Sequence, residues 1–411
     1  MSGPLTLTPL LEFEAAAPFR FRQPNAAPES EQAGQARERY LTSSEPFANQ
    51  VLLGNPQVFR VLKPRASLPC LARERWAHTD YRGRKVLFLL PGEALGENAA
   101  IALFLSAFIA AKRPQAVGVF CARSCSDIFL RDPRIRVFPL WIGRREIRRW
   151  NLLVDLGQLE SRRSIDTWPV DMEGELLGAF GGIAADEARY PSAARAMTPG
   201  TARPAIGLFP IASSPLRTLP PSVGLALAEG LAEQGDVTMV LNAGQRQGQL
   251  YRAALHGRLP PSVRIVEQFE CIGALMQAID GFDFAVFADS GPSHLAKLTA
   301  VPGVTVYSSA PADVLQGRFR NLAAWTIPFA GPHCHAPCGL AKLRKDAAGR
   351  VGCMGSLGLP LDALPQLAGR ADAAEVDRLQ REPVPCLAAL AAAPGALVSF
   401  VRSALRSSWS G

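Results

Sequence analysis

The residues best suited to chemistry lie in one run, Phe287–Ala296, with the sequence FADSGPSHLA. An apolar strand is expected to end at Asp289, followed by a tight turn and then a helix. Parallel strands present ligands beyond their carboxyl ends, and the free N–H groups at a helix start suit a diphosphate. The pattern therefore predicts that Ser290, Gly291 and His294 contact an anion, with Asp289 beside them. The alternative is an ordinary strand–turn–helix with a capping serine.

A second group is formed by four late cysteines. These are Cys334, Cys338, Cys353 and Cys386. Four thiolates can hold iron or zinc in a tetrahedral site, and His333 and His335 are possible substitutes. The alternative is four free thiols, because the spacing fits no common zinc finger. The remaining cysteines are read as buried packing residues or inert thiols: Cys70, Cys121, Cys125 and Cys271.

The elements that would position these residues alternate between strands and helices. Strands are predicted in the first half at Lys85–Leu90, Ala116–Phe120, Arg136–Leu140 and Leu152–Leu156. Helices are predicted between them at Asn98–Ala111 and Ser126–Arg131. Such alternation indicates βαβ units and a parallel sheet.

The same pattern starts again near residue 205. Strands are predicted at Ala205–Phe209, Val237–Leu241, Val263–Ile265, Phe284–Phe287 and Val304–Tyr307. Helices are predicted at Pro221–Gln234, Tyr251–His256, Cys271–Ile279 and Ser293–Thr299. The stretch Ala184–Arg203, rich in Ala, Pro and Ser, is the predicted linker. Two Rossmann-like domains occur in GT-B glycosyltransferases, some epimerases and periplasmic binding proteins, so the fold alone does not choose among them.

Size and charge narrow the classes of protein. At 411 residues with 48% hydrophobic residues, the chain is long enough for two cores. The net charge of +8 favours an anionic partner, although the run from Arg144 to Arg149 is better read as a solvated helix face. No nucleic-acid-binding motif is present. The start lacks a signal-peptide pattern, and the longest apolar stretch, Ala99–Ala111, is short for a membrane span. We therefore expect a cytoplasmic protein without a membrane span.

Four segments together resemble glycosyltransferase family 9, the bacterial heptosyltransferases. The strongest is DSGPSHLA followed by VPGVTVY, and the second is GLFPIASS with RTLP, at Gly207–Pro220. The others are Val86–Glu97 and Leu153–Gln158. The resemblance covers roughly residues 84–330 and implies a GT-B fold with two Rossmann-like domains facing each other across a cleft.

The resemblance also implies roles for individual residues. Ser213 and Ser214 fall on the family's phosphate loop, and Arg217 replaces its usual lysine. Glu97 falls where the family has a catalytic aspartate, which takes the acceptor's proton in inverting transfer. Glu93 in the same loop is a rival base, and Glu97 is alternatively a helix-start acid. The family donor implied is ADP-heptose.

A branch of the family, the autotransporter O-heptosyltransferases, resembles the layout of this chain further. Those enzymes carry an N-terminal extension and a four-cysteine iron site, form large rings, and attach heptose to hydroxyl groups of an adhesin passenger. This implies that Cys334, Cys338, Cys353 and Cys386 hold iron, with zinc as the alternative, and that the chain forms a homo-oligomer.

The resulting hypothesis is an inverting heptosyltransferase that acts on serine side chains of an autotransporter protein. The alternatives are a lipopolysaccharide core heptosyltransferase and a non-catalytic metal-binding scaffold with a degenerate transferase fold. The expected parts are an N-terminal extension (1–80), an acceptor domain (81–195), a nucleotide-sugar domain (200–330), a cysteine-containing segment (331–390) and a C-terminal helix (391–411).

Overall fold

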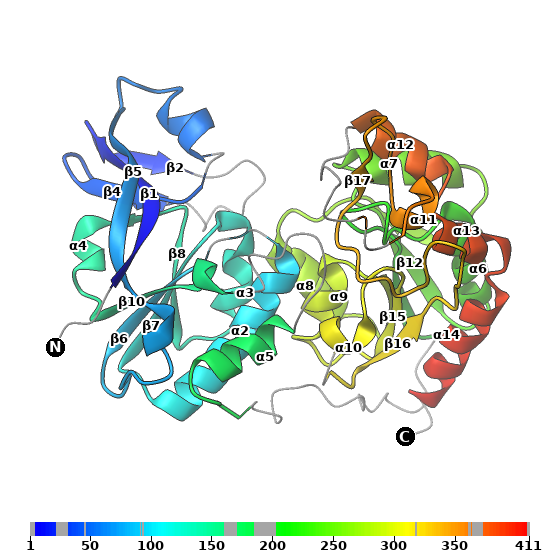
Figure 1. Ribbon diagram of the computed structural model, residues 1–411. Coiled ribbons are helices and arrows are strands. Elements are labelled where there is room, and N and C mark those ends of the chain that lie inside the picture. The colour runs from blue at the N-terminus through cyan, green and yellow to red at the C-terminus, as the bar shows by residue number, and fades with distance from the viewer. Residues whose placement is uncertain are drawn as a thin grey trace. The chain divides into compact units, whose positions relative to one another are not determined.

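The chain forms two compact α/β units (Figure 1). The computed structural model describes residues 5–21, 32–44, 47–90, 92, 94–159, 171–184, 203–316, 319–360, 363 and 373–408. Within these ranges the first unit holds residues 5–159, 172–184 and 270–274, and the second holds 171, 203–269 and 275–408.

The first unit contains a parallel sheet with the strand order β10-β6-β7-β8 in the described part of the chain. Its strands are β6 (Lys85–Leu89), β7 (Ala116–Cys121), β8 (Ile135–Pro139) and β10 (Leu152–Asp155). All four predicted strands are therefore present, each within a residue or two of its predicted bounds. They are mainly apolar because a parallel sheet is covered on both faces.

Helix α2 (Leu95–Lys112) supplies much of the core of this unit. Its Phe104 and Phe108 are fully buried and meet Phe88 of β6 and Phe180, which follows α5 (Met172–Ala179). The helix is longer than predicted, and by length and composition it could cross a membrane, as could the bent pair Ala374–Ala392 with Gly395–Ser407. Burial of two phenylalanines in an aromatic cluster is equally what a core helix requires.

Residues before the parallel sheet form an antiparallel sheet, which the sequence did not predict. Its order is β5-β1-β4-β9 among the described residues. The strands are β1 (Leu5–Ala15), β4 (Arg39–Thr42), β5 (Phe59–Leu71) and β9 (Trp141–Gly143). The outer strand β9 comes from far along the chain, so the N-terminal segment is tied by backbone hydrogen bonds to the same unit as the parallel sheet.

An aromatic cluster and an ion pair stabilise this N-terminal sheet. An aromatic cluster, in which Phe13 contacts Phe19, Tyr40 and Phe59, packs against Trp141 of β9. A short β2–β3 pair (Phe19–Phe21 and Gln32–Gly34) adds to it.

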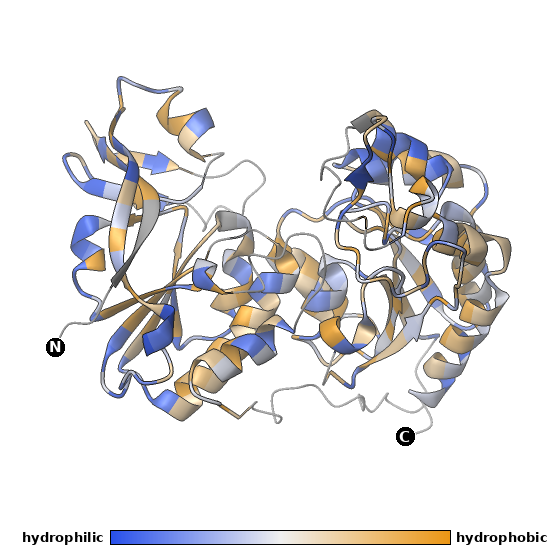
Figure 2. Cartoon of the chain, viewed as in Figure 1, coloured by the Kyte–Doolittle hydropathy of each residue, from blue (hydrophilic) through white to orange (hydrophobic). Residues whose placement is uncertain are grey.

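An ion pair secures a second face of the sheet. Arg144 Nε and Nη2 each donate to a carboxylate oxygen of buried Glu12 at 3.0 Å. This contact holds the pKa of Glu12 below its ordinary value. Helix α4 (Arg144–Ile147) is mainly hydrophilic in Figure 2, as predicted for a solvated face, but its first arginine has this internal partner.

The second unit contains a six-stranded parallel sheet, β13-β12-β11-β14-β15-β16, in the part of the chain that the structure describes. The strands are β11 (Ala205–Phe209), β12 (Asp236–Val240), β13 (Arg264–Val266), β14 (Phe284–Ala288), β15 (Gly303–Tyr307) and β16 (Leu322–Thr326). Five were predicted and β16 was not. With one parallel sheet in each unit, the α/β class with two Rossmann-like units is confirmed.

All four helices predicted after residue 205 are present, not all with the predicted boundaries, and the short helix α10 was not predicted. The helices are α6 (Pro221–Ala232), α7 (Arg246–Leu255), α8 (Ile272–Asp280), α9 (Gly291–Ala296) and α10 (Ala312–Leu315). Helix α7 begins five residues before the predicted Tyr251. Helix α9 begins at Gly291, so the predicted turn over Ser290–Pro292 is wrong. Proline is well suited to a first helical turn because its missing N–H has no intrahelical partner there.

The C-terminal segment closes the core of this unit. It contains the β17–β18 hairpin (Arg344–Lys345 and Val351–Gly352), α11 (Met354–Leu357), α12 (Ala373–Arg381), α13 (Pro385–Ala392) and α14 (Gly395–Ser407). Leu387, Leu397 and Val401 are buried in the same cluster as strands β11 and β15. Residues after 331 therefore belong structurally to the second unit. The division into five parts remains a prediction.

Candidate anion-binding site

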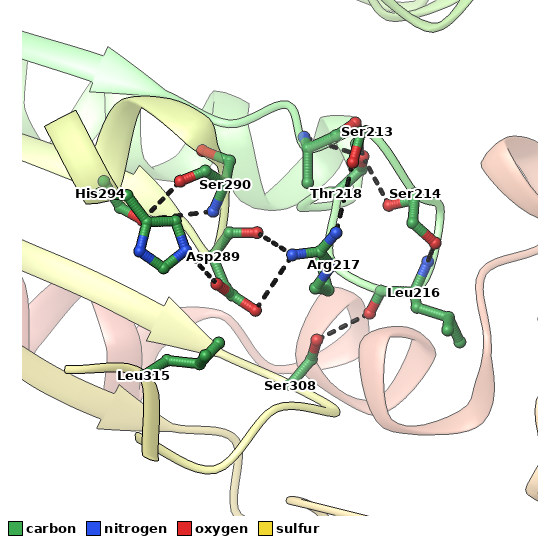
Figure 3. A network of polar contacts seen from close by, with 12 residues as sticks. Ser213, Ser214, Leu216, Arg217, Thr218, Asp289, Ser290, His294, Ser308 and Leu315 are labelled. Carbon is green, nitrogen blue, oxygen red and sulfur yellow. Dashed lines mark hydrogen bonds and ion pairs between the residues drawn. The ribbon is translucent and has the colours of Figure 1, made fainter. Parts of the chain in front are cut away.

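The candidate site lies in the second unit, beyond the carboxyl ends of neighbouring strands β11, β14 and β15 (Figure 3). The loop after β11 brings Arg217 next to Asp289, which follows β14. Ser308 follows β15 and donates to the Leu216 carbonyl at 2.7 Å, which joins the third strand to the same loop. The edge of the sheet that Rossmann-like folds use for ligands is thus the edge at which these side chains meet.

The loop after β11 is fixed by Thr218. Its buried Oγ1 accepts from the Ala212 N–H and lies 3.1 Å from the carbonyl oxygens of Ala212 and Ser214. The Ser214 carbonyl also accepts the N–H groups of Arg217 and Thr218. These bonds curl residues 212–218 into a tight turn. The turn places the Arg217 side chain over the end of β14.

Arg217 contacts both Asp289, which follows β14, and Ser213 in the loop after β11. Its Nη1 donates to the Asp289 carbonyl oxygen at 3.3 Å and lies 3.5 Å from Asp289 Oδ2. Its Nη2 donates to Ser213 Oγ, also at 3.3 Å. The side chain is only 11% exposed, so its charge is weakly screened. The structure therefore brings together three of the predicted donor-site residues, and Arg217 joins the two predicted motifs.

Asp289 is a fully buried acid. Burial raises the pKa of its carboxyl above the ordinary value, while the nearby Arg217 and Lys297 lower it. Neither carboxylate oxygen receives a hydrogen bond from the described residues. A buried carboxylate held by charge alone is unusual, since buried polar groups are nearly always hydrogen-bonded. Such a group is a marker of a functional site rather than of packing.

His294 lies on the other side of Asp289. Its Nε2 is 3.9 Å from Asp289 Oδ1, which is too long for a hydrogen bond. Burial and the charges of Lys297 and Arg217 hold the pKa of His294 well below its usual range. The imidazole is therefore neutral at physiological pH. It lies beside Asp289 and Ser290 (Figure 3).

Ser290 begins helix α9. Its N–H donates to Ser293 Oγ at 3.3 Å, and Ser293 Oγ donates back to the Ser290 carbonyl at 2.7 Å. The Ser290 hydroxyl is buried without a hydrogen-bond partner among the described residues. Because α9 has only six residues, the case for anion binding rests on side-chain groups and not on a helix terminus. Gly291 is the first residue of this helix.

Two residues of the site were missed in the sequence. Lys297 is 4% exposed, and its Nζ lies 3.0 Å from His294 Nδ1. Its position three residues after His294 is the signal that could have found it, since residues at i and i+3 share a helix face. Ser308 was missed because nothing in the sequence shows that the residue after the predicted strand Val304–Tyr307 contacts the loop after β11. The complete group holds one acid and two cations, a balance that favours an anionic ligand.

The predicted base lies in the other unit. Glu97 is in the first turn of α2 and is partly exposed. Glu97 is therefore a helix-start acid, which was the alternative to the role of general base. A carboxylate at the start of a helix can also act as a base, so the two roles are compatible. The rival Glu93 lies outside the described residues.

The four late cysteines lie in one region of the second unit. Buried Cys353 belongs to its main hydrophobic cluster, and Cys338 and Cys386 pack against it. Burial and then the neighbouring thiols of the other three cysteines raise the pKa of Cys386 to about 12. Within the described residues, however, no group of three or more His, Cys, Asp or Glu side chains has the geometry to hold a metal ion. The donor types suit iron or zinc, but the arrangement is not a closed site.

Three of the other four cysteines agree with the predicted packing role. Cys70, Cys121 and Cys125 are buried, whereas Cys271 is partly exposed.

Comparison with known proteins gives structural relatives only. No family model matches the chain, and no curated protein matches it. The E. coli ADP-heptose lipopolysaccharide heptosyltransferase II has 15% identity and a TM-score of 0.43, covering 62% of this chain and 93% of the relative. A glycosyl transferase of family 9 from Veillonella parvula has 11% identity and a TM-score of 0.47, covering 60% and 87%.

A third similar structure covers more of this chain. The iron-containing dodecameric glycosyltransferase TibC from enterotoxigenic E. coli has 12% identity and a TM-score of 0.44, covering 81% of this chain and 80% of the relative. At these identities and TM-scores a likeness does not extend to function. The functional argument therefore rests on the residues of the site.

Proposed function

We propose that the chain is an inverting glycosyltransferase that transfers heptose from ADP-heptose to serine side chains of an autotransporter protein. The observation that carries the proposal is the buried group around Asp289, in which Arg217 connects the two motifs that resemble the heptosyltransferase donor site. Both motifs were identified in the sequence, and the fold brings them into contact at the ligand-binding edge of a Rossmann-like sheet.

The chemistry follows from the charges of this group. The acceptor oxygen attacks the anomeric carbon, the bond from that carbon to the diphosphate oxygen breaks, and ADP leaves with the electron pair. Arg217 would stabilise the negative charge that develops on the diphosphate, and the hydroxyl groups of Ser213 and Ser290 can donate to it. Glu97 would take the proton of the acceptor hydroxyl as general base. This assignment requires the two units to face each other in the GT-B manner.

The four cysteines have a separate part in the proposal. We assign them to an iron site, with zinc as the alternative, that stabilises the C-terminal segment of the second unit. Their proximity supports this assignment, because Cys334, Cys338 and Cys353 all lie close enough to Cys386 to act on its thiol. The thiols would have to move closer together to ligate one ion. No catalytic step passes through this site.

The proposal also includes a cytoplasmic location and assembly into a homo-oligomer. The location follows from the signal-peptide and membrane-span patterns that the sequence lacks, and the oligomer follows from the resemblance to the autotransporter branch. Light scattering of the purified chain tests the second: a monomer at micromolar concentration would remove the oligomer from the proposal.

The direct test is a transfer assay. The purified chain is incubated with ADP-heptose and a co-expressed autotransporter passenger, and the passenger is weighed by mass spectrometry. A mass increment of one heptose on serine-containing peptides is expected, and it should be absent with Glu97→Gln. Transfer to lipopolysaccharide core instead would favour the alternative acceptor. Donor binding without transfer to either would favour a non-catalytic scaffold.

A further inference from the structure

A buried lysine stands behind the histidine of the candidate site. Lys297 follows α9 directly, and its side chain turns back towards His294. Its ammonium donates to the backbone carbonyl of Leu315 and lies 5.1 Å from the centre of the Phe319 ring. A carbonyl and an aromatic face both favour a cation, so the position of the charge is well determined.

The contact between Lys297 and His294 determines which ring nitrogen of His294 carries the proton. The two nitrogens, Lys297 Nζ and His294 Nδ1, are 3.0 Å apart. A lysine ammonium has three N–H donors and no acceptor, so His294 Nδ1 must accept. A neutral imidazole has one proton, which is then on Nε2. This nitrogen is the one that lies 3.9 Å from Asp289 Oδ1.

The surroundings of the ring keep it in that form. The charged groups that act on His294 are Lys297 on the Nδ1 side, Arg217 across the site and Asp289 on the Nε2 side. Burial and the two cations both oppose a second proton. Asp289 is too far from the ring for a hydrogen bond, so the Nε2–H group does not donate to it.

We propose that Lys297 is a positioning residue that holds His294 as the neutral Nε2–H tautomer, so that this N–H is offered as a donor to the anion bound beside Asp289. Lys297 supplies positive charge to the site, and His294 supplies a directed hydrogen bond without adding charge. Identification of the anion as a nucleoside diphosphate rests on the proposed function, but the tautomer itself does not.

Nuclear magnetic resonance of the full chain tests the tautomer directly. The protein is labelled with 15N-histidine; it has five histidines, and His294 is assigned by the signal that disappears in His294→Gln. In the wild type we expect the shifts of a neutral Nε2–H imidazole that stays neutral below the ordinary pKa of histidine. An Nδ1–H tautomer or an imidazolium in the wild type would overturn the inference without any Lys297 variant.

Variants of Lys297 test its cause. Lys297→Met removes the donor but keeps the length of the side chain, and should give mixed tautomers and a pKa that rises towards the ordinary value. Lys297→Arg, which still donates, should keep the Nε2–H form. The control is Lys342→Met at an exposed lysine of the same unit, which should change nothing. An unaltered tautomer in folded Lys297→Met would contradict the inference.

Calorimetry with ADP separates this inference from the proposed function. Loss of the fixed donor should weaken ADP binding about tenfold in Lys297→Met, the effect of one lost hydrogen bond to a charged group. Unchanged ADP affinity with an altered tautomer would overturn the claim that His294 offers its N–H to the ligand. If the wild type bound no ADP but showed the Nε2–H tautomer, the proposed function would fail while the positioning by Lys297 stood.

Discussion

Replacement of Arg217 by methionine should destabilise the second unit and do so in a pH-dependent way. The side chains of Arg217 and Asp289 are 11% and 1% exposed, and Arg217 Nη1 lies 3.5 Å from Asp289 Oδ2. At an effective dielectric of about 20, this separation corresponds to an attraction of about 4–5 kcal/mol. Desolvation offsets much of this value, but loss of one partner of a buried pair costs about 3–5 kcal/mol. Because Lys297 remains near Asp289, we expect the lower end, about 3 kcal/mol.

The sign of the pH dependence follows from Asp289. Burial raises the pKa of its carboxyl in the wild type, and Arg217 is the first of the groups that lower it. Without Arg217 the folded-state pKa rises further above the unfolded value. A carboxyl with a raised folded pKa stabilises the protein below its unfolded pKa, and that stabilisation is lost as the pH rises through the folded pKa. The penalty of Arg217→Met must therefore increase with pH.

The assay is urea unfolding of wild type and variant at about pH 5 and about pH 8, where the penalty should be larger at the higher pH. The matched control is Arg252→Met, which removes a surface pair of 2.9 Å with Glu267 whose partners are 57% and 47% exposed. Its cost should stay within about 1 kcal/mol at both pH values. An equal loss for Arg217→Met at both pH values, or a loss no larger than that of the control, would refute the electrostatic reasoning.

Three further predictions concern the rest of the chain. Phe180→Ala empties a site shared with Phe104 and Phe108, so it should lower the unfolding free energy of the first unit by about 3–5 kcal/mol while ADP affinity in calorimetry stays the same. Glu97→Gln should abolish heptose transfer while the ADP affinity stays the same. Residual heptose transfer in the mass assay would show that another residue is the general base. Elemental analysis should find iron in the wild type and little iron in Cys386→Ala. Gly355→Ala should also lower the iron content, because its new Cβ would lie 2.5 Å from Cys334 Sγ. Equal iron content in all three proteins would contradict the metal assignment.

Most strands of the two parallel sheets were predictable because they are largely apolar runs bounded by turn residues, whereas β16 was not predicted. Strand β14 (Phe284–Ala288) is buried at every position, and such a run admits few other interpretations. Strand β5 was not predictable for the opposite reason. It contains Pro64 and Pro69, which argue against a strand unless it lies at a sheet edge, and β5 is the edge strand.

The residues of the site that belong to the two sequence motifs were predictable. Arg217, Asp289 and His294 were identified individually, and their contact follows from the adjacency of β11 and β14. The role of Lys297 depends on where the ammonium points after the helix ends, which spacing alone does not give. The predicted start of α9 is too late because a proline also suits a turn, whereas Pro292 lies in the first helical turn.

Calorimetric titration of the full chain with ADP, UDP and GDP tests the central claim most directly. The account predicts that ADP binds most tightly, and that Arg217→Met, which removes the charge that joins Ser213 to Asp289, weakens ADP binding at least about tenfold. Binding of none of the three nucleotides by the folded wild type, or equal ADP affinity in wild type and folded Arg217→Met, would contradict it.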